Sequence, residues 1–395
     1  MNRFVVSGLI ACAMLASTVY GQNSTDTKPA AATQANSGQV TSQPATAPTT
    51  ATMGLKDAYA GKFLIGAAND LRYCSDAELA NIKANYNVMT PENCMKPQMI
   101  HPSKDRYNWT AADALVQWCQ DNNIKVWGHT LCWHSQTGRW FFERGADDQP
   151  TTRELTMARL KSHITTVVGR YKGRAIGWDV VNEAINMGGS GETENLRNSN
   201  WHRLIGPDYL TLAFKWAHEA DPQAQLYYND FDIEKGALEN KGKHASSMLL
   251  LKRLIKEGAP IHGVGIQGHW SLNTNVAEVE KAIANYESLG LKVSISELDV
   301  TATGRNTGAF PMRGGGGGTV SPEAFQKQAE VYAKLFDVFK RHSNTISRVT
   351  FWGLSDRRSW RAWQRPLVFD AQLQPKPALH AILDVASGKY VAPQP

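Results

Sequence analysis

The sequence predicts an α/β protein whose folded part is a single (β/α)8 TIM barrel. Eight short apolar runs alternate with helical patterns, which is typical of parallel strands joined by crossover helices. Six of these runs end in polar or indole side chains, and a parallel barrel carries its site at the carboxyl ends of its strands. The 395 residues are enough for one barrel with its loops. An open doubly wound sheet is the alternative, but no GxGxxG motif follows the first run.

The first 53 residues differ in composition from the rest of the chain. Residues 4–16 form an apolar stretch after Arg3, too short for a membrane span of about 20 residues but suited to a secretory signal. We therefore predict a signal peptide over 1–21 and a secreted protein, extracellular or periplasmic, with lipoprotein anchoring at Cys12 as a minor alternative. Residues 22–53, rich in Thr, Ala, Ser and Pro, predict a disordered linker. The folded domain should cover 54–390, and no membrane span is expected.

The individual elements follow from apolar runs closed by polar residues. The predicted strands are 63–68, 87–93, 125–134, 176–183, 225–230, 263–270, 292–300 and 348–354. The predicted helices are 76–85, 111–122, 152–170, 208–219, 241–257, 276–289 and 322–341. Ser75, and Ser321 followed by Pro322, are favourable residues at the starts of two of these helices.

Composition narrows the function classes. The net charge of +6 comes from 42 basic and 36 acidic residues without basic runs, which argues against nucleic-acid binding. The 12 Trp residues offer flat apolar faces that suit sugar rings, although a large core also uses Trp. Cys74, Cys94, Cys119 and Cys132 show no CxxC pair or zinc spacing. Cys119 is expected to be a buried free thiol, and Cys94 and Cys132 could approach each other.

The polar residues gather at the ends of the predicted strands. Buried polar groups need partners, so this pattern is costly for stability and points to one shared site. The residues concerned are Glu92, Asn93 and nearby Lys96 on the second strand, His129 and Trp133 on the third, Asp179, Asn182 and Glu183 on the fourth, Gln267 and His269 on the sixth, Glu297 and Asp299 on the seventh, and Trp352 on the eighth.

Glu183 and Glu297 close strands on facing walls of the predicted barrel. Two facing carboxyl groups are what glycoside hydrolysis needs, because one protonates the leaving oxygen while the other attacks or activates water. A structural ion pair is the usual reading of a single Glu, but it does not explain two at apolar strand ends. Alternation along the strands places His269 beside Glu297, with Asp299 on its other nitrogen. That contact favours an ionised Glu297.

Other chemistries find less support. A metal site built from His129, His134, His269 and Glu183 lacks an HxH or HExxH spacing, so we expect no metal. The run 314–318 consists of Gly and lacks the Lys–Ser/Thr of a phosphate-binding loop, so a flexible surface loop is the better interpretation.

The motifs around these residues resemble family 10 of the glycoside hydrolases, the retaining endo-β-1,4-xylanases. Segment 178–184 (WDVVNEA) resembles the acid/base signature of the family, and 294–299 (SISELD) resembles its nucleophile motif. The likeness extends, in the order of the family, through 91–96, 128–136, 228–230, 265–269, 352–356, 359–360 and 366–370. This resemblance implies an eight-stranded barrel, a retaining mechanism through a covalent glycosyl-enzyme, and no cofactor.

By that resemblance, Glu183 matches the acid/base and Glu297 matches the nucleophile. Asp299 is a supporting residue, because it is expected to hold the His269 ring beside Glu297. Asn182 matches the group that binds the 2-hydroxyl next to the cleaved bond. The remaining substrate-binding positions are Glu92, Asn93 and Lys96 for the next sugar, and His129, Trp133, Gln267, His269, Trp352 and Trp360 around the reacting ring. Trp360 is also our candidate for a wall that excludes the hydroxymethyl group of glucose.

The expected substrate is xylan with its xylo-oligosaccharides, acted on by a monomer without nucleic-acid partners. Another β-1,4-glycanase on the same barrel, such as an endoglucanase, is the alternative, and a sugar-binding barrel without catalysis is a further one. Two departures from the family pattern affect the leaving-group side of the cleft. Only 361–365 separate Trp360 from Pro366, and Arg357–Arg358 replace a Gly-containing turn.

Overall fold

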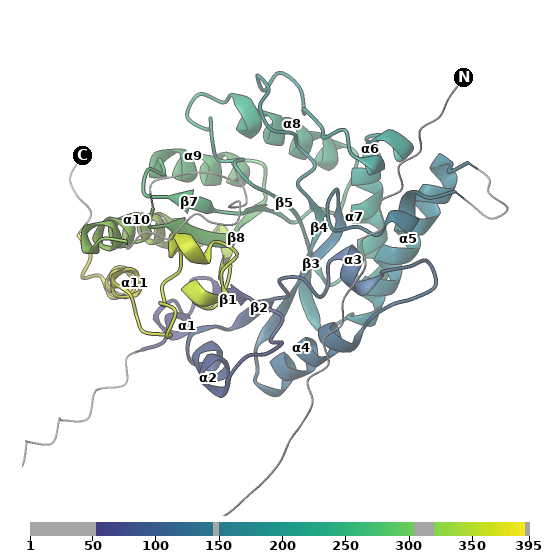
Figure 1. Ribbon diagram of the computed structural model, residues 1–395. Helices are drawn as coiled ribbons and strands as arrows, with labels where there is room; N and C mark the ends of the chain where they lie inside the picture. The colour runs from purple at the N-terminus through teal and green to yellow at the C-terminus, as the bar shows by residue number, and fades with distance from the viewer. Residues whose placement is uncertain (1–52, 145–149, 304–319, 392–395) are drawn as a thin grey trace, which may run out of the picture. The chain divides into compact units, whose positions relative to one another are not determined.

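The computed structural model describes residues 53–144, 150–303 and 320–391 (Figure 1). The predicted signal peptide, all of the predicted linker except its last residue, and the glycine run at 314–318 lie outside the described residues. The described residues belong to one compact unit, Thr52–Pro395. None of the helices within these ranges is long and apolar enough to cross a membrane.

Nine parallel strands form a closed barrel with eight positions. Their order is β6-β5-β4-β3-β2-β1-β9-β8-β7, and pairing of β6 with β8 closes the ring. The strands are β1 (Leu64–Ala68), β2 (Val88–Thr90), β3 (Lys125–Trp133), β4 (Ala175–Asn182), β5 (Gln225–Asp230), β6 (Gly263–Ile266), β7 (His269–Ser271), β8 (Lys292–Thr301) and β9 (Ile346–Phe351). The predicted (β/α)8 architecture is confirmed.

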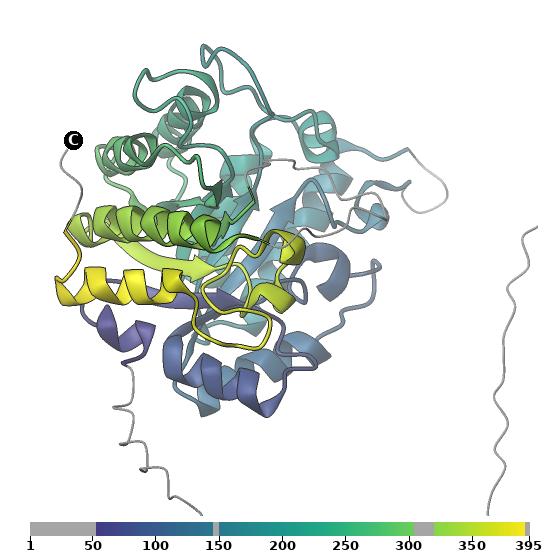
Figure 2. The same cartoon turned by 60° about the vertical axis from the view of Figure 1, so that its left-hand side comes forward.

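Helices surround the barrel (Figure 1). They are α1 (Leu55–Ala58), α2 (Asp76–Asn85), α3 (Pro97–Ile100), α4 (Thr110–Asp121), α5 (Arg153–Arg170), α6 (Asn200–Ile205), α7 (Tyr209–Ala220), α8 (Gly242–Lys256), α9 (Val276–Glu287), α10 (Pro322–Arg341) and α11 (Pro377–Ser387), with 3-10 turns η1 (Arg139–Phe142), η3 (Asp356–Arg358) and η4 (Ala362–Gln364). Figure 2 shows α10 and α11 packed side by side.

The predicted helix starts are confirmed. Ser75 accepts a hydrogen bond from the backbone N–H of Glu78, whose side chain returns to the Ser75 N–H in a capping box. Ser321 caps α10 by accepting a hydrogen bond from the backbone N–H of Ala324, with Pro322 in the first turn. The sequence did not predict α1, α3, α6 and α11, of which three are six residues or shorter.

Three predicted strands need correction. The predicted strand 348–354 is shifted, since β9 covers Ile346–Phe351 and Gly353 beyond it adopts a φ of +132°. The predicted strand 263–270 is divided into β6 and β7, because Gly268 between them adopts a φ of +80°, outside the extended region. The predicted strand 87–93 ends as β2 at Thr90, because Pro91 has no N–H to continue the ladder. The breaks after β2 and β6 both lie at the carboxyl ends of the strands, where they release polar side chains from the sheet.

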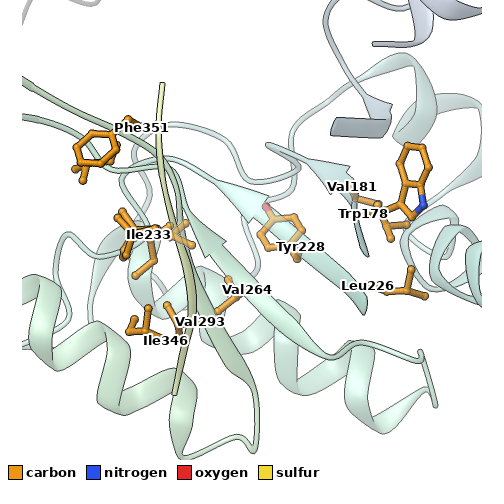
Figure 3. Close-up of a cluster of buried hydrophobic side chains, with 14 of the residues drawn as sticks. Trp178, Val181, Leu226, Tyr228, Ile233, Val264, Val293, Ile346 and Phe351 are labelled. Carbon is orange, nitrogen blue, oxygen red and sulfur yellow. The ribbon is translucent and has the colours of Figure 1, made fainter. Parts of the chain in front are cut away.

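The main core lies between the strands and the helices. Figure 3 shows side chains of this layer from five strands and a loop, namely Trp178, Val181, Leu226, Tyr228, Ile233, Val264, Val293, Ile346 and Phe351. A second small cluster is formed by Val88, Trp127 and Tyr227. Cys119 is buried and unpaired as expected, and the four described cysteines are all free, so Cys94 and Cys132 form no disulfide.

Candidate active site

A cleft of about 730 Å³ opens at the carboxyl ends of the strands. Every predicted substrate-binding or catalytic position lines it: Glu92, Asn93, Lys96, His129, Trp133, Asn182, Glu183, Gln267, His269, Glu297, Trp352 and Trp360. The predicted supporting residue, Asp299, is fully buried and contacts this lining from behind. Residues from six strand ends therefore do meet in one site.

Glu183 directly follows β4, and its backbone conformation is unusual. Its φ of +57° lies in the left-handed region, which a non-glycine residue adopts at an energetic cost that is characteristic of functional sites. The backbone N–H donates to Asn229 O at 2.8 Å, which helps to hold this turn. The carboxyl group accepts hydrogen bonds from Trp133 Nε1 at 2.9 Å and from Gln267 Nε2 at 3.0 Å. Glu183 is therefore fixed with its carboxyl group in the cleft.

Glu297 on β8 is a buried carboxylate with charge-stabilising partners. Asn229 Nδ2 donates to its Oε1 at 2.7 Å, and His269 Nε2 lies 3.2 Å from its Oε2. Burial alone would raise the pKa of Glu297, but the hydrogen bond from His269, electrostatic attraction from His129 and His269, and the hydrogen bond from Asn229 together outweigh burial and lower it. Glu297 is therefore ionised at neutral pH.

His269 is held between two carboxylates, as the alternation of the strands predicted. Its Nδ1 lies 2.9 Å from Asp299 Oδ2, on the side opposite Glu297. Burial by itself would lower the pKa of His269, but Asp299 and Glu297 together raise it to about 9. The imidazolium form thus prevails at neutral pH and donates to both carboxylates.

Two amide side chains connect the carboxyl groups of the site. Gln267 Nε2 lies 3.3 Å from Asn182 Oδ1 while also bonding Glu183, and Asn229 Nδ2 lies 3.0 Å from the same Asn182 oxygen while also bonding Glu297. Asn182 therefore joins the surroundings of Glu183 to those of Glu297. Asn229 was not among the predicted site residues, although its position at the end of a predicted strand was a usable signal.

His129 on β3 is oriented by a carboxylate that does not itself line the cleft. Its Nδ1 lies 2.9 Å from Oδ2 of Asp179, which also accepts a hydrogen bond from Trp127 Nε1 at 2.9 Å on its other oxygen. The Trp352 indole meets the His129 ring edge to face, with centroids 5.3 Å apart. His129 is thus fixed on one side by charge and on another by an aromatic ring.

The group Glu92, Asn93 and Lys96 lies in the same cleft after β2. Lys96 Nζ donates to Asn93 Oδ1 at 3.1 Å and lies 5.2 Å from the Trp133 ring centroid. Burial, together with the nearby charge of Asp70, raises the pKa of Glu92 to about 7. Burial also lowers the pKa of Lys96. These three side chains offer both donors and acceptors, as binding of sugar hydroxyls requires.

Trp360 forms the most exposed aromatic part of the lining, with 48% of its surface accessible. Its Nε1 donates to Asp299 Oδ2 at 2.9 Å, and its ring meets that of His269 at a centroid distance of 5.0 Å. Arg361 stacks on the Trp360 ring at 4.5 Å and donates to Asp299 Oδ1 at 3.1 Å. The indole is therefore fixed at the edge of the cleft.

Several lining residues were not predicted from the sequence. They are Ser135, Gln136, Met187, Phe231, Asp232, Lys235, Arg361 and Gln364. All of them lie in loops or turns, where no strand or helix period singles out a residue. The short segment 361–365 nevertheless contributes Arg361 and Gln364 to the cleft. Over the described ranges, no cluster of His, Cys, Asp and Glu suited to a metal ion is present.

A parallel barrel that brings the carboxyl groups of Glu183 and Glu297 into a Trp-lined cleft at its strand ends is typical of the class of barrel glycoside hydrolases. The sequence profile of glycosyl hydrolase family 10 matches residues 54–385. The chain belongs to this family.

Individual relatives agree with this assignment. Endo-1,4-beta-xylanase B of Paenibacillus barcinonensis is 38% identical over 83% of this chain and 97% of its own length. Exoglucanase XynX of Acetivibrio thermocellus is 38% identical over 84% of this chain, which corresponds to only 29% of that longer protein. A crystal structure of TsXylA, described as an intracellular xylanase from Thermoanaerobacterium saccharolyticum, contains a mutant in complex with xylotriose. It has a TM-score of 0.75 and 37% identity, covering 85% of this chain and 99% of that one.

Proposed function

We propose that this protein is an endo-β-1,4-xylanase that hydrolyses xylan with retention of the anomeric configuration. The observation that carries the proposal is the state of Glu297, an ionised carboxylate held by His269 and Asn229 in the same cleft as Glu183. A buried carboxylate with fixed donors is suited to nucleophilic attack, and a second carboxyl group supplies the proton that the leaving sugar needs.

The reaction has two steps in this proposal. Glu297 attacks the anomeric carbon while Glu183 protonates the glycosidic oxygen. The bond between the anomeric carbon and the glycosidic oxygen breaks, and the leaving chain departs as an alcohol. Glu183, now a carboxylate, then takes a proton from water, whose oxygen attacks the anomeric carbon and releases Glu297. Two inversions give a product that keeps the β configuration. No step needs a metal or a cofactor.

The remaining lining supplies substrate binding. Asn182, fixed by Asn229 and Gln267, is our candidate for binding the 2-hydroxyl of the reacting sugar. Glu92, Asn93 and Lys96 are candidates for the next sugar towards the non-reducing end. His129, Trp133, Gln267, His269 and Trp352 are candidates for the lining around the reacting ring.

Trp360 is our candidate for the discrimination between xylose and glucose. The two sugars differ by a hydroxymethyl group, and a fixed indole can exclude that group by overlap. Support comes from the three contacts that fix Trp360, those with Asp299, His269 and Arg361. A misplacement of the sugar by about 1 Å can lower the rate about 100-fold, so even a partial clash discriminates strongly.

Cleavage of β-1,4-glucan is the second candidate function. It is favoured by one observation, the 38% identity to a relative named Exoglucanase XynX. The two candidates are separated by comparing initial rates of reducing-sugar release from xylan and from carboxymethylcellulose. NMR of the first anomer formed from xylo-oligosaccharides tests retention, since an α-anomer formed first would refute the proposed mechanism. A 2-fluoro xylobioside inactivator should label Glu297, as mass spectrometry of its peptides would show.

The domain organisation also remains a proposal. We infer a signal peptide over 1–21, a linker over 22–53 and a (β/α)8 catalytic domain over 54–390, in a secreted and monomeric protein. The composition of the first 53 residues supports it, although TsXylA is described as intracellular. Amino-terminal sequencing of the protein exported by its host, with light scattering on the purified chain, tests processing and oligomeric state.

A further inference from the structure

A buried arginine lies inside the barrel below the cleft. Arg348 on β9 is 1% exposed, and its Nη2 lies 3.3 Å from Oδ1 of Asp179, which is equally buried. Its guanidinium stacks on the Trp127 ring at 3.9 Å, and its Nη1 donates to Thr350 Oγ1 at 3.1 Å. Gly177 leaves room for this arrangement, because a Cβ there would lie 2.4 Å from the Trp127 ring. The guanidinium is thus fixed on three sides.

Asp179 connects this arginine to the cleft. One of its oxygens accepts from Trp127 Nε1 and Arg348, and the other faces Nδ1 of His129. His129 lines the cleft, so the ring edge that carries Nε2 is left for the substrate. The row from Arg348 through Asp179 to His129 joins three strands, β9, β4 and β3.

Arg348 balances the charge of Asp179 inside the barrel. Asp179 carries one negative charge and Arg348 one positive charge, and a guanidinium does not lose its proton in proteins. The other titratable groups near the pair are Tyr227, whose pKa burial raises so that it stays neutral, and the more distant Glu297. Without Arg348, Asp179 would be an unbalanced charge in the barrel interior, and the carboxylate that holds His129 would lose its fixed position.

We propose that Arg348 is a positioning residue for hydrolysis: by fixing the Asp179 carboxylate, it holds His129 in one orientation at the cleft. This inference rests on the proposed glycosidase function. The reacting groups tolerate little displacement, since a misplacement of about 1 Å can lower the rate about 100-fold. A His129 ring that is no longer held would therefore lower the rate of the reaction more than the binding of substrate.

The test compares three variants on an aryl β-xylobioside, with kcat and KM measured from pH 4.5 to 8. Arg348→Met removes the charge and keeps most of the volume. Arg348→Lys keeps the charge. Lys376→Met is the matched control, because Lys376 forms an equally buried ion pair with Asp356 at 3.0 Å and none of its contacts lines the cleft.

We expect Arg348→Met to lower kcat at least about tenfold while KM changes less than about threefold. The loss should fall on kcat, because the other cleft residues still bind the substrate while His129 is no longer held in one orientation. Arg348→Lys should recover part of kcat. Lys376→Met should lower the melting temperature but leave kcat and its pH profile unchanged.

Two results would overturn the proposed role of Arg348. If Arg348→Met loses stability but keeps the kcat and pH profile of the parent, Arg348 only stabilises the barrel and the inference is wrong. Should that variant not fold, the double variant R348M/D179N removes both charges together, and a kcat within about twofold of the parent would overturn the inference. Absence of activity in the parent itself would instead refute the proposed function.

Discussion

Replacing Asn229 by Ala tests the arrangement around Glu297 most directly. The Asn229 amide is fully buried, donates to Glu297 at 2.7 Å and to Asn182 at 3.0 Å, and accepts from Ser296 Oγ at 2.5 Å. A hydrogen bond to a charged group contributes about 1.5–3 kcal/mol. If that stabilisation is fully used in the transition state, Asn229→Ala should lower kcat/KM about 10- to 150-fold.

The pH dependence of kcat/KM should also shift in a definite direction in Asn229→Ala. The Asn229 bond favours the charged form of Glu297, so its loss raises the pKa of that carboxyl group. A nucleophile must be ionised, so the acid limb of kcat/KM should move to higher pH in Asn229→Ala. The assay is hydrolysis of an aryl xylobioside across pH, with melting temperatures recorded in parallel. Asn285→Ala is the control, because the Asn285 amide bonds His244 away from the cleft. An unmoved acid limb in Asn229→Ala would refute the electrostatic role.

Three further predictions follow from the same site and its surroundings. Glu183→Ala should abolish xylan hydrolysis but spare the first step on aryl xylosides with good leaving groups, and azide should restore turnover; equal losses on good and poor leaving groups would contradict the assignment. The parent should prefer xylobiosides over cellobiosides by at least about tenfold in kcat/KM, roughly 1.4 kcal/mol. Trp360→Ala should shrink that ratio, mainly by lowering activity on xylobiosides, and an unchanged ratio would exclude Trp360 as the wall. Burial lowers the pKa of His163 to about 3 and also lowers that of His101, whereas unfolded imidazoles titrate near 6.5. The free energy of unfolding should therefore fall as the pH drops from about 6.5 towards 3, less so in His163→Gln, and parallel melting curves for both proteins would contradict this.

The parts of the site that the sequence predicted depend on the two-residue period of strands. Glu297 and Asp299 are two apart on β8, so their side chains share a face, and His269 on the neighbouring segment lies between them. Such a prediction needs only the positions of strand ends. It was therefore independent of the break between β6 and β7, which the sequence did not predict.

The contacts that the sequence could not predict depend on the register between strands and on loop conformation. Asn229 on β5 meets Glu297 on β8 across the intervening β6, so the contact depends on the register of three strands in the barrel. The short helices α3 and α6 have too few residues for a periodic pattern and depend on tertiary contacts. Arg348 lies in a predicted strand, but its partner Asp179 is 169 residues away in the chain. The pairing of these two residues could therefore not be predicted from the sequence.

Asp299 shows how both kinds of contact meet in one residue. Its pairing with His269 follows from strand alternation, whereas its hydrogen bonds to Trp360 and Arg361 depend on the conformation of a short loop. The same carboxylate thus fixes the imidazolium beside Glu297 and the indole at the edge of the cleft. The His269 imidazolium and the Trp360 indole both depend on the fully buried Asp299 carboxylate. A change at Asp299 should therefore alter the reactivity of Glu297 and the shape of the cleft together. The short segment 361–365, through Arg361, therefore helps to hold Trp360 at the edge of the cleft.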